Sequence, residues 1–489
     1  MGCGTHVRES SGASVNAGQI DSDRTDIYSV ATMARPKRGE ILSLTIDDLA
    51  FGGEGVGRAD GYVVFVPGGL PGDRLRVRLV QVRSRFGRGV VDAIEEPSPQ
   101  RVEAPCPYFG RCGGCRLQHM AYPAQLAFKA KQVADALERL GGLKGVEVRP
   151  IIGAEETFGY RNKMEFTVAR GPKEPMVVGL HEADRYDSVL DIERCLLQSD
   201  RMNALLGEAR GFFAERGLTV YEQDSGEGLL RFLMLREGTH TGELMANVVT
   251  SAPAVSEVAP LAPRLEARVP GTTSVVMNVN PKKASVAVGV EEHLLGGRDH
   301  IRESVGGLSF QVSAGSFFQT NTRQAERLFE LVVESADLTG TETVHDLYSG
   351  TGAISLLLAR RARWVYGLEV AQAAVDDAGV NAAANGITNC TFLCGEVRFV
   401  LPSLIAKGVT ADVVVADPPR AGFHPKALHA LITLGARRIV YVSCNPTTLA
   451  RDLGELVRGG YRLEWVQPVD MFPHTPHIEA VARLERVAS

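Results

Sequence analysis

The alternation of apolar and polar positions is most regular in the C-terminal part of the chain. From about residue 325 onward, helical patterns follow short apolar runs at 343–348, 364–370, 390–394, 411–417 and 438–443. Strands that alternate with helices predict a doubly wound parallel sheet. Two further strands are expected at 461–470 and 477–484, and they should pair antiparallel because no helix separates them. The fold class predicted for this part is α/β.

The sequence before residue 325 has a different pattern of apolar and polar positions. Residues 37–98 contain short β runs separated by glycines, which predict a small antiparallel barrel with strands at 42–46, 62–67, 74–82 and 89–94. The patterns that follow predict an α+β unit that includes a helix at 121–141. Residues 1–34 are rich in Gly, Ser and Asp and predict a disordered leader. We therefore expect a leader at 1–34, a barrel domain at 35–98, a central α+β domain at 99–310 and the C-terminal sheet domain at 311–489.

Length and composition limit the class of protein and the binding partners that can be expected. A chain of 489 residues is expected to form roughly two to four domains. The formal net charge is −5, so any nucleic-acid-binding surface must be local. No apolar stretch approaches the length of a membrane span and no signal peptide is visible. We expect a cytoplasmic protein with no membrane partner, and a monomer.

One local basic stretch lies in the predicted barrel. Six arginines and no acid occur between Arg74 and Arg88, and the alternation at 74–79 puts three of them on one strand face. Without balancing acids, this stretch favours a surface that contacts phosphates. The alternative is a solvated edge strand that uses charge to prevent aggregation.

The eight cysteines are unevenly placed. Cys106, Cys112 and Cys115 form one group, and Cys195 follows about 80 residues later. This grouping indicates metal ligation in a reducing compartment rather than a disulfide framework. On spacing alone, a zinc ion and a cubane iron–sulfur cluster are equally compatible with four thiolates.

Cys444 lies where the predicted strand at 439–442 meets a helix that Pro446 is placed to start. Open α/β sheets bind ligands in this crevice, at the carboxyl ends of their strands. A helix N-terminus also stabilises a thiolate, which is the nucleophilic form of cysteine. Taken alone, Cys444 has the alternative interpretation of a buried, inert residue.

The first strand-to-helix turn of the sheet carries a cofactor pattern. Gly350 and Gly352 allow close backbone approach to a ligand, and Glu369, 19 residues after Gly350, can accept two ribose hydroxyls. The spacing fits a dinucleotide or S-adenosylmethionine, and the missing third glycine favours S-adenosylmethionine. Asp417, at the end of the fourth strand, should project into the same crevice. As the alternative, Glu369 and Asp417 merely cap helices.

Together these features resemble the RNA 5-methyluridine methyltransferases, the family of the bacterial 23S rRNA (uracil-5-)-methyltransferases. The resemblance runs from about residue 37 to near the C-terminus and rests on several motifs. They are the TRAM-like segments 53–58 and 64–73, the four cysteines, Phe317–Asn321, Leu347–Gly352, Asp417–Arg420, Ser443–Pro446 and His477–Ala480.

The resemblance implies a class I methyltransferase sheet preceded by an OB-like, RNA-binding TRAM barrel. It implies Cys444 as the nucleophile and Glu479 as the base. It implies two cofactor sites: a 4Fe-4S cluster held by Cys106, Cys112, Cys115 and Cys195, and S-adenosylmethionine at Gln319, Tyr348, Gly350, Glu369 and Asp417.

The implied reaction is methylation of C5 of a uridine in RNA, with the target base out of its stack and packed on an aromatic such as Phe317. The favoured substrate is 23S rRNA, because the tRNA-specific bacterial relatives lack both TRAM and cluster; tRNA is the runner-up. Two alternatives belong to other classes. A non-catalytic RNA-binding protein with a structural metal leaves Cys444 and Glu479 unexplained. A cysteine hydrolase using Cys444 with His474 or His477 leaves the pattern at 350–369 unused.

Overall fold

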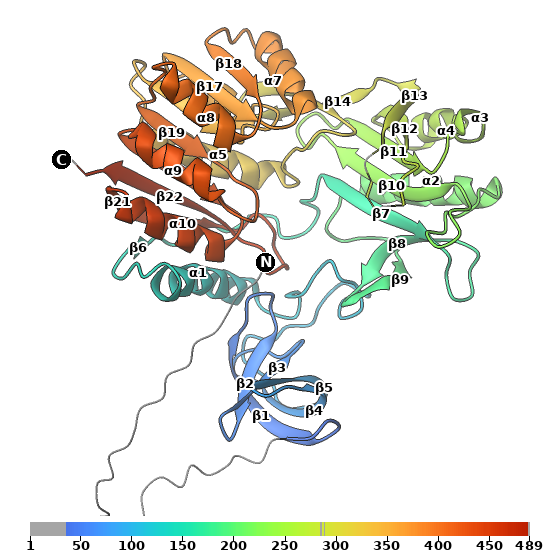
Figure 1. Ribbon diagram of the computed structural model, residues 1–489. Helices are drawn as coiled ribbons and strands as arrows, with labels where there is room; N and C mark the ends of the chain where they lie inside the picture. The colour runs from blue at the N-terminus through green and yellow to red at the C-terminus, as the bar shows by residue number, and fades with distance from the viewer. Residues whose placement is uncertain (1–35, 284–285, 288, 488–489) are drawn as a thin grey trace, which may run out of the picture.

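The computed structural model describes residues 36–487 except 284–285 and 288, so the predicted leader at 1–34 lies outside it. The described chain forms a closed five-stranded barrel, a seven-stranded sheet, a two-stranded hairpin and an eight-stranded sheet. In Figure 1 the blue barrel lies below the green seven-stranded sheet and the orange and red eight-stranded sheet. None of the helices in the described ranges is long and apolar enough to span a membrane. The domain boundaries given above stay predictions.

The barrel has the strand order β1-β2-β3-β5-β4 and closes through the pairing of β4 with β1. Alternation along β4 buries Leu75, Val77 and Leu79 and turns the arginines outward, as the pattern predicts. The strands are β1 (Ile41–Leu49), β2 (Gly55–Ala59), β3 (Tyr62–Val66), β4 (Arg74–Val82) and β5 (Phe86–Glu96).

Strand β2 was not among the predicted strands, because its glycines break the apolar alternation. Gly55 and Gly57 are required there by close backbone packing. A Cβ atom would lie 2.8 Å from the Gly69 carbonyl oxygen at Gly55, and 2.8 Å from the Thr45 carbonyl oxygen at Gly57. The glycines that this tight packing requires are therefore also the reason why the apolar pattern did not predict the strand.

The arginine stripe on β4 has acidic partners on the neighbouring strand, so the premise of an unbalanced basic surface is wrong. Arg76 and Arg78 both bind Asp92 of β5, at 2.8 and 2.5 Å. Arg74 likewise binds Glu96 at 3.0 Å. The acids lie in the segment just beyond Arg88, and the antiparallel pairing of β4 and β5 brings them alongside. The stripe is a row of exposed cross-strand ion pairs rather than free guanidinium groups.

The central sheet has the order β13-β12-β11-β10-β7-β8-β9, and its main core lies against α2 and α4. The strands are β7 (Lys163–Ala169), β8 (Val177–Glu182), β9 (Arg185–Asp191), β10 (Leu230–Glu237), β11 (Leu244–Thr250), β12 (Thr272–Val279) and β13 (Glu291–Gly297); the helices are α2 (Asp200–Glu215), α3 (Val255–Val258) and α4 (Leu261–Arg268). The hairpin β14 (His300–Val305) and β15 (Leu308–Ser313) follows.

The C-terminal sheet has the order β18-β17-β16-β19-β20-β22-β21-β6. Strands β16 to β20 are parallel and β22 is antiparallel to both neighbours, which confirms the predicted α/β class and the final antiparallel pair. The strands are β16 (Thr343–Leu347), β17 (Trp364–Glu369), β18 (Cys390–Cys394), β19 (Val413–Ala416), β20 (Arg438–Ser443), β21 (Tyr461–Val469) and β22 (Glu479–Arg486). The helices are α5 (Thr322–Ala336), α6 (Ala353–Ala359), α7 (Gln372–Ala384), α8 (Val397–Ala406), α9 (Pro425–Leu434) and α10 (Pro446–Arg458).

Helices cover both faces of this sheet. One core packs the sheet against α5, α6 and α7, and the other packs it against α8, α9, α10 and α1 (Tyr122–Arg139). In Figure 1 the teal α1 lies beneath the red α10, although more than 300 residues separate them in the sequence. The edge strand β6 (Glu147–Val148) pairs with β21. One strand of this sheet, β6, and one helix that covers it, α1, therefore come from the segment before the central sheet.

Candidate active site and cysteine cavity

Cys444 lies between β20 and α10, as the sequence predicts. Strand β20 ends at Ser443, and the Asn445 side chain caps the helix by accepting the backbone N–H of Thr447 at 3.0 Å. Pro446 occupies the first helical turn, where its missing N–H costs nothing. The strand end and the cap therefore fix the backbone on both sides of the thiol.

A cavity of about 1340 Å³ opens at the carboxyl ends of the parallel strands. These ends surround the point where the strand order reverses between β16 and β19, which is the ligand-binding crevice of such sheets. All seven residues expected at the catalytic and cofactor sites line this one cavity: Gln319, Tyr348, Gly350, Glu369, Asp417, Cys444 and Glu479. The fold thus brings them together, while their individual roles remain predictions.

The turn after β16 has an unusual backbone. Tyr348 adopts a left-handed φ of 68°, which is uncommon for a residue with a side chain and is often found at functional sites. Gly350 has a φ of 53° and the position of a Cβ there faces open space, so a ligand can approach the backbone closely. Its N–H donates to Glu369 at 3.1 Å, and the other Glu369 oxygen accepts the N–H groups of Val370 and Ala371. The loop and the acid at the end of β17 therefore hold each other in place.

Asp346, which sequence reasoning did not assign to the site, is a buried acid beneath this turn. Its Oδ2 accepts a hydrogen bond from Ser355 at 2.5 Å, but Oδ1 is buried without a partner among the described residues, as is the Ser349 hydroxyl. Burial raises the pKa of Asp346 to about 7, and the Asp417 and Glu369 carboxylates add to the effect. A positively charged ligand would satisfy these groups, so the cavity fits the sulfonium and ammonium groups of S-adenosylmethionine.

Asp417 and Glu479 are two acids that line the cavity and lie close enough to interact electrostatically. Burial raises the pKa of Asp417 to about 6. Burial and the Asp417 charge together raise the pKa of Glu479 well above its ordinary value, while Arg420 opposes the increase. Two carboxyl groups so placed do not both ionise easily, and both pKa values are raised.

The same acids change the expected ionisation of Cys444. Burial raises the pKa of its thiol to about 11, and the charges of Glu479 and Asp417 contribute, whereas Arg420 acts in the opposite direction. The helix N-terminus therefore does not give this thiol a low pKa, contrary to the expectation from the sequence. Burial and the two neighbouring carboxylates raise the pKa of the thiol more than the helix N-terminus lowers it.

Two cavity residues had no place in the predicted methyl-transfer site. Arg420 donates to Nδ1 of His477 at 3.4 Å, and both residues line the cavity with Cys444. Both belong to motifs recognised in the sequence, but no pattern there indicates that they meet. His474, by contrast, is buried against Phe158 at a ring distance of 4.2 Å and does not line the cavity. It is therefore not available as a base for Cys444.

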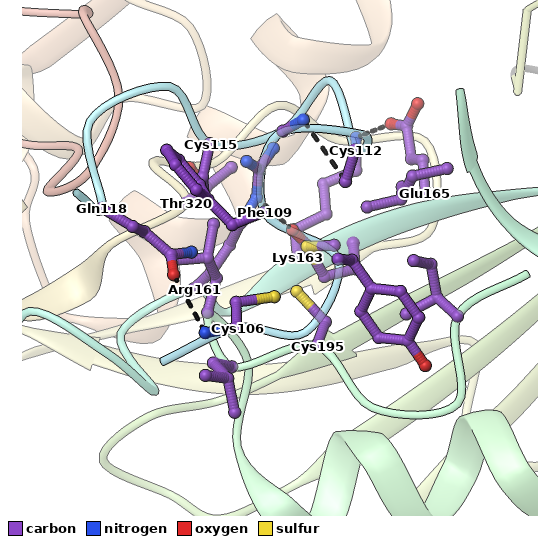
Figure 2. Close-up of a pocket in the computed structure, with 17 residues that line it drawn as sticks. Cys106, Phe109, Cys112, Cys115, Gln118, Arg161, Lys163, Glu165, Cys195 and Thr320 are labelled. Atoms are coloured by element: carbon purple, nitrogen blue, oxygen red, sulfur yellow. Dashed lines mark hydrogen bonds and ion pairs between the residues drawn. The ribbon is translucent and has the colours of Figure 1, made fainter. Parts of the chain in front are cut away.

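A second cavity, of about 340 Å³, is lined by Cys106, Cys112, Cys115 and Cys195 (Figure 2). The fourth cysteine, from the segment between β9 and α2, joins the other three, and Figure 2 shows the thiols of Cys106 and Cys195 pointing toward each other. Burial and the neighbouring thiolates raise the pKa of Cys115 to about 12. Within the described ranges, no three His, Cys, Asp or Glu side chains are arranged to hold a single metal ion.

Hydrogen bonds join the two cavities. The Asn162 amide donates to the carbonyl of Gln319 at 2.9 Å, and its backbone N–H donates to the carbonyl of Thr320 at 2.8 Å. The backbone N–H groups of Arg116 and Leu117, just after Cys115, donate to the carbonyl of His474. The cysteine loop is thus tied to the segment that carries Glu479, and Asn162, next to Arg161 and Lys163 of the cysteine cavity, is tied to the segment that carries Gln319.

Comparisons with known proteins agree with this architecture. The tRNA (Uracil-5-)-methyltransferase family matches residues 294–487, and the TRAM domain matches residues 35–91. An uncharacterized RNA methyltransferase of Halalkalibacterium halodurans is 43% identical over 92% of this chain and 97% of its own length. A similar relative from Chlorobaculum tepidum is 41% identical over 92% and 98%.

Among solved structures, the chain is similar to the Pyrococcus abyssi tRNA (uracil-54, C5)-methyltransferase in complex with S-adenosyl-L-homocysteine. The identity is 32%, the TM-score is 0.72, and the match covers 90% of this chain and 99% of the other. These similarities confirm the predicted family, fold class and enzyme class, and they exclude the hydrolase and the non-catalytic binding protein. The chain belongs to the tRNA (uracil-5-)-methyltransferase family and is an S-adenosylmethionine-dependent RNA methyltransferase that acts on C5 of uracil.

Proposed function

We propose that the enzyme methylates one uridine through a covalent adduct with Cys444. Uracil C5 is too weak a nucleophile to accept a methyl group directly. Addition of the Cys444 thiolate to C6 forms the S–C6 bond and moves electrons onto C5 and O4, so that C5 becomes enolate-like. The observation that supports this route is the shared cavity, lined by a cysteine at a strand end and by a glutamate.

Each of the remaining steps has a candidate residue. S-adenosylmethionine, when bound, would supply an electrophilic methyl group to C5 and leave as S-adenosylhomocysteine, and Tyr348, Gly350, Glu369, Gln319 and Asp417 would hold it. Glu479 then takes the proton from C5, the C5–C6 double bond re-forms, and the S–C6 bond breaks to release the Cys444 thiolate. A carboxyl group whose pKa is raised is a stronger base once it is ionised.

Phe317 is suited to pack on the target base. It lines the cavity, and 69% of its side chain is exposed, which is unusual for a phenylalanine. A base that has left its stack gains a new stacking partner on such a ring. Phe317 and Gln319 lie in the same short segment, so one loop would meet both the base and the cofactor.

As the substrate we propose 23S rRNA, on the combination of a TRAM barrel with the four-cysteine cavity. A specific observation favours tRNA as the second candidate: the Pyrococcus abyssi structure that matches over 90% of this chain is a tRNA enzyme. Mapping 5-methyluridine in both RNA classes from a deletion strain separates them. We expect one position in 23S rRNA to lose its methyl group while tRNA is unchanged; loss confined to tRNA would contradict the rRNA assignment.

We also propose that the four cysteines hold a 4Fe-4S cluster that organises the protein or the RNA. The donor chemistry fits, because the four cysteines line one cavity. Four thiolates leave no open iron for a substrate. The hydrogen bonds of Arg116 and Leu117 to His474, and of Asn162 to Gln319, support a structural role.

Anaerobically purified protein is therefore expected to be brown and to contain four iron and four sulfide per chain. The Cys195→Ser variant should lose most of this iron, because it removes the ligand that comes from the second segment. Cys394→Ser is the matched control, since Cys394 is exposed and lines neither cavity. A colourless protein with one zinc per chain would contradict the cluster.

A further inference from the structure

The Cys444 adduct places negative charge on O4 of the pyrimidine, because O4 is conjugated with the C5–C6 bond. A fixed hydrogen-bond donor aimed at that oxygen stabilises the charge as it forms. The cysteine and the two acids do not supply such a donor when they are ionised. Among the side-chain donors that line the cavity, His477 is a candidate for this oxygen.

His477 has the required position. It is exposed to the cavity that Cys444 and Glu479 also line, and only one residue separates it from Glu479. Its backbone N–H donates to the Thr475 hydroxyl at 3.2 Å, and its ring lies edge-on to Phe472 at 6.1 Å. These contacts hold the imidazole at the cavity wall.

The contact with Arg420 fixes the proton on the imidazole. Arginine has only donors, so the 3.4 Å contact makes Nδ1 of His477 the acceptor. In the neutral ring the proton is then on Nε2. No hydrogen bond to Nε2 occurs among the described residues, so this N–H remains available to a ligand in the cavity.

The ring is also neutral at physiological pH. Partial desolvation of the ring within the cavity lowers the pKa of His477 to about 4, and the positive charges of Arg420, Lys129, Arg161 and Arg116 lower it further. Only below that pH would the ring gain a second proton. A neutral imidazole donates a hydrogen bond without transferring its proton, which suits a group that must stabilise an enolate oxygen and then release it.

We propose that His477 donates its Nε2–H to O4 of the target uracil and that Arg420 holds it in this tautomer. The assignment rests on the proposed covalent mechanism, because only addition at C6 charges O4. His477 is then a substrate-contacting residue, and Arg420 is a positioning residue that acts through it.

The test compares two proteins on three RNAs. Single-turnover methyl transfer is measured for wild type and His477→Ala with RNA that carries uridine, 4-thiouridine or 2-thiouridine at the target position. Sulfur accepts hydrogen bonds weakly, so replacing O4 removes the partner of His477 chemically. His477→Gln serves as the conservative variant, since its amide retains a donor.

We expect His477→Ala to be slower on uridine by about 10²-fold. The decisive quantity is the rate on uridine divided by the rate on 4-thiouridine, measured for each protein. This ratio should be larger for wild type than for His477→Ala by a factor of about ten or more. The 2-thiouridine ratio should be the same for both proteins, and His477→Gln should recover part of the 4-thio effect. The ratio cancels any general loss of structure, because each protein is compared with itself.

If the ratio of uridine to 4-thiouridine rates is equal for wild type and His477→Ala, the assignment is overturned. It is also overturned if the two proteins differ only in the ratio of uridine to 2-thiouridine rates. Failure of the proposed function has a different signature. Retained methylation by the Cys444→Ala variant, measured in parallel on uridine RNA, would contradict the covalent route, whatever the thio ratios.

Discussion

The Cys444→Ala variant is expected to lose methylation by about 10⁴-fold or more, because Cys444 carries the one thiol among the described residues that line the cavity. Removing one sulfur leaves the glycine turn, Glu369 and Asp346 in place, so S-adenosylmethionine should bind with similar affinity. The measurement is turnover with labelled cofactor, together with calorimetric titration of S-adenosyl-L-homocysteine.

Cys394→Ala is the matched control for this variant. It also removes a thiol near a strand end of the same sheet, but Cys394 is exposed and outside the cavity lining. Its turnover should equal that of wild type. Appreciable turnover by Cys444→Ala would remove the covalent route.

Replacing Glu479 by glutamine is expected to separate addition from release. The amide preserves the shape of the side chain but cannot take the C5 proton, so the methylated base should remain bonded to Cys444. Turnover should fall by about 10²- to 10⁴-fold, and a denaturation-resistant protein–RNA complex should accumulate. Gel electrophoresis in denaturant followed by mass spectrometry detects this complex and its added methyl group.

Formation of the adduct should not be impaired in this variant. Glu479 raises the pKa of the Cys444 thiol, so a neutral amide lowers it and favours the attacking thiolate. The Glu479→Gln/Cys444→Ala double variant is the control, and it should form no complex. Release of free 5-methyluridine RNA by Glu479→Gln at the wild-type rate would show that another group is the base.

Local sequence patterns predicted the elements that carry the site. The run at 439–442 with Asn445 and Pro446 specified a buried strand, a cap and a helix start, all within a few residues. The turn at Gly350 and the acid at Glu369 could likewise be predicted, because parallel strands place their carboxyl ends at one edge of the sheet. Motifs of this kind depend on backbone geometry that neighbouring residues determine.

Features that depend on distant segments could not be predicted in this way. The partners of the β4 arginines lie on β5, and the pairing register decides which acid meets which guanidinium. The raised pKa of Cys444 depends on Glu479, 35 residues away, and on the depth of the cavity. The contact between Arg420 and His477 joins two motifs 57 residues apart. The pairing of these charged groups and the positions of their protons could therefore be inferred only from the tertiary structure.

The most direct measurement of the central claim uses purified enzyme, methyl-labelled S-adenosylmethionine and unmodified RNA. 23S rRNA and tRNA from a strain that lacks the enzyme are incubated separately, digested to nucleosides and separated by chromatography. The account predicts label only in 5-methyluridine, at one position of 23S rRNA, and none with Cys444→Ala. Label in another nucleoside, or 5-methyluridine formed equally well by Cys444→Ala, would contradict it.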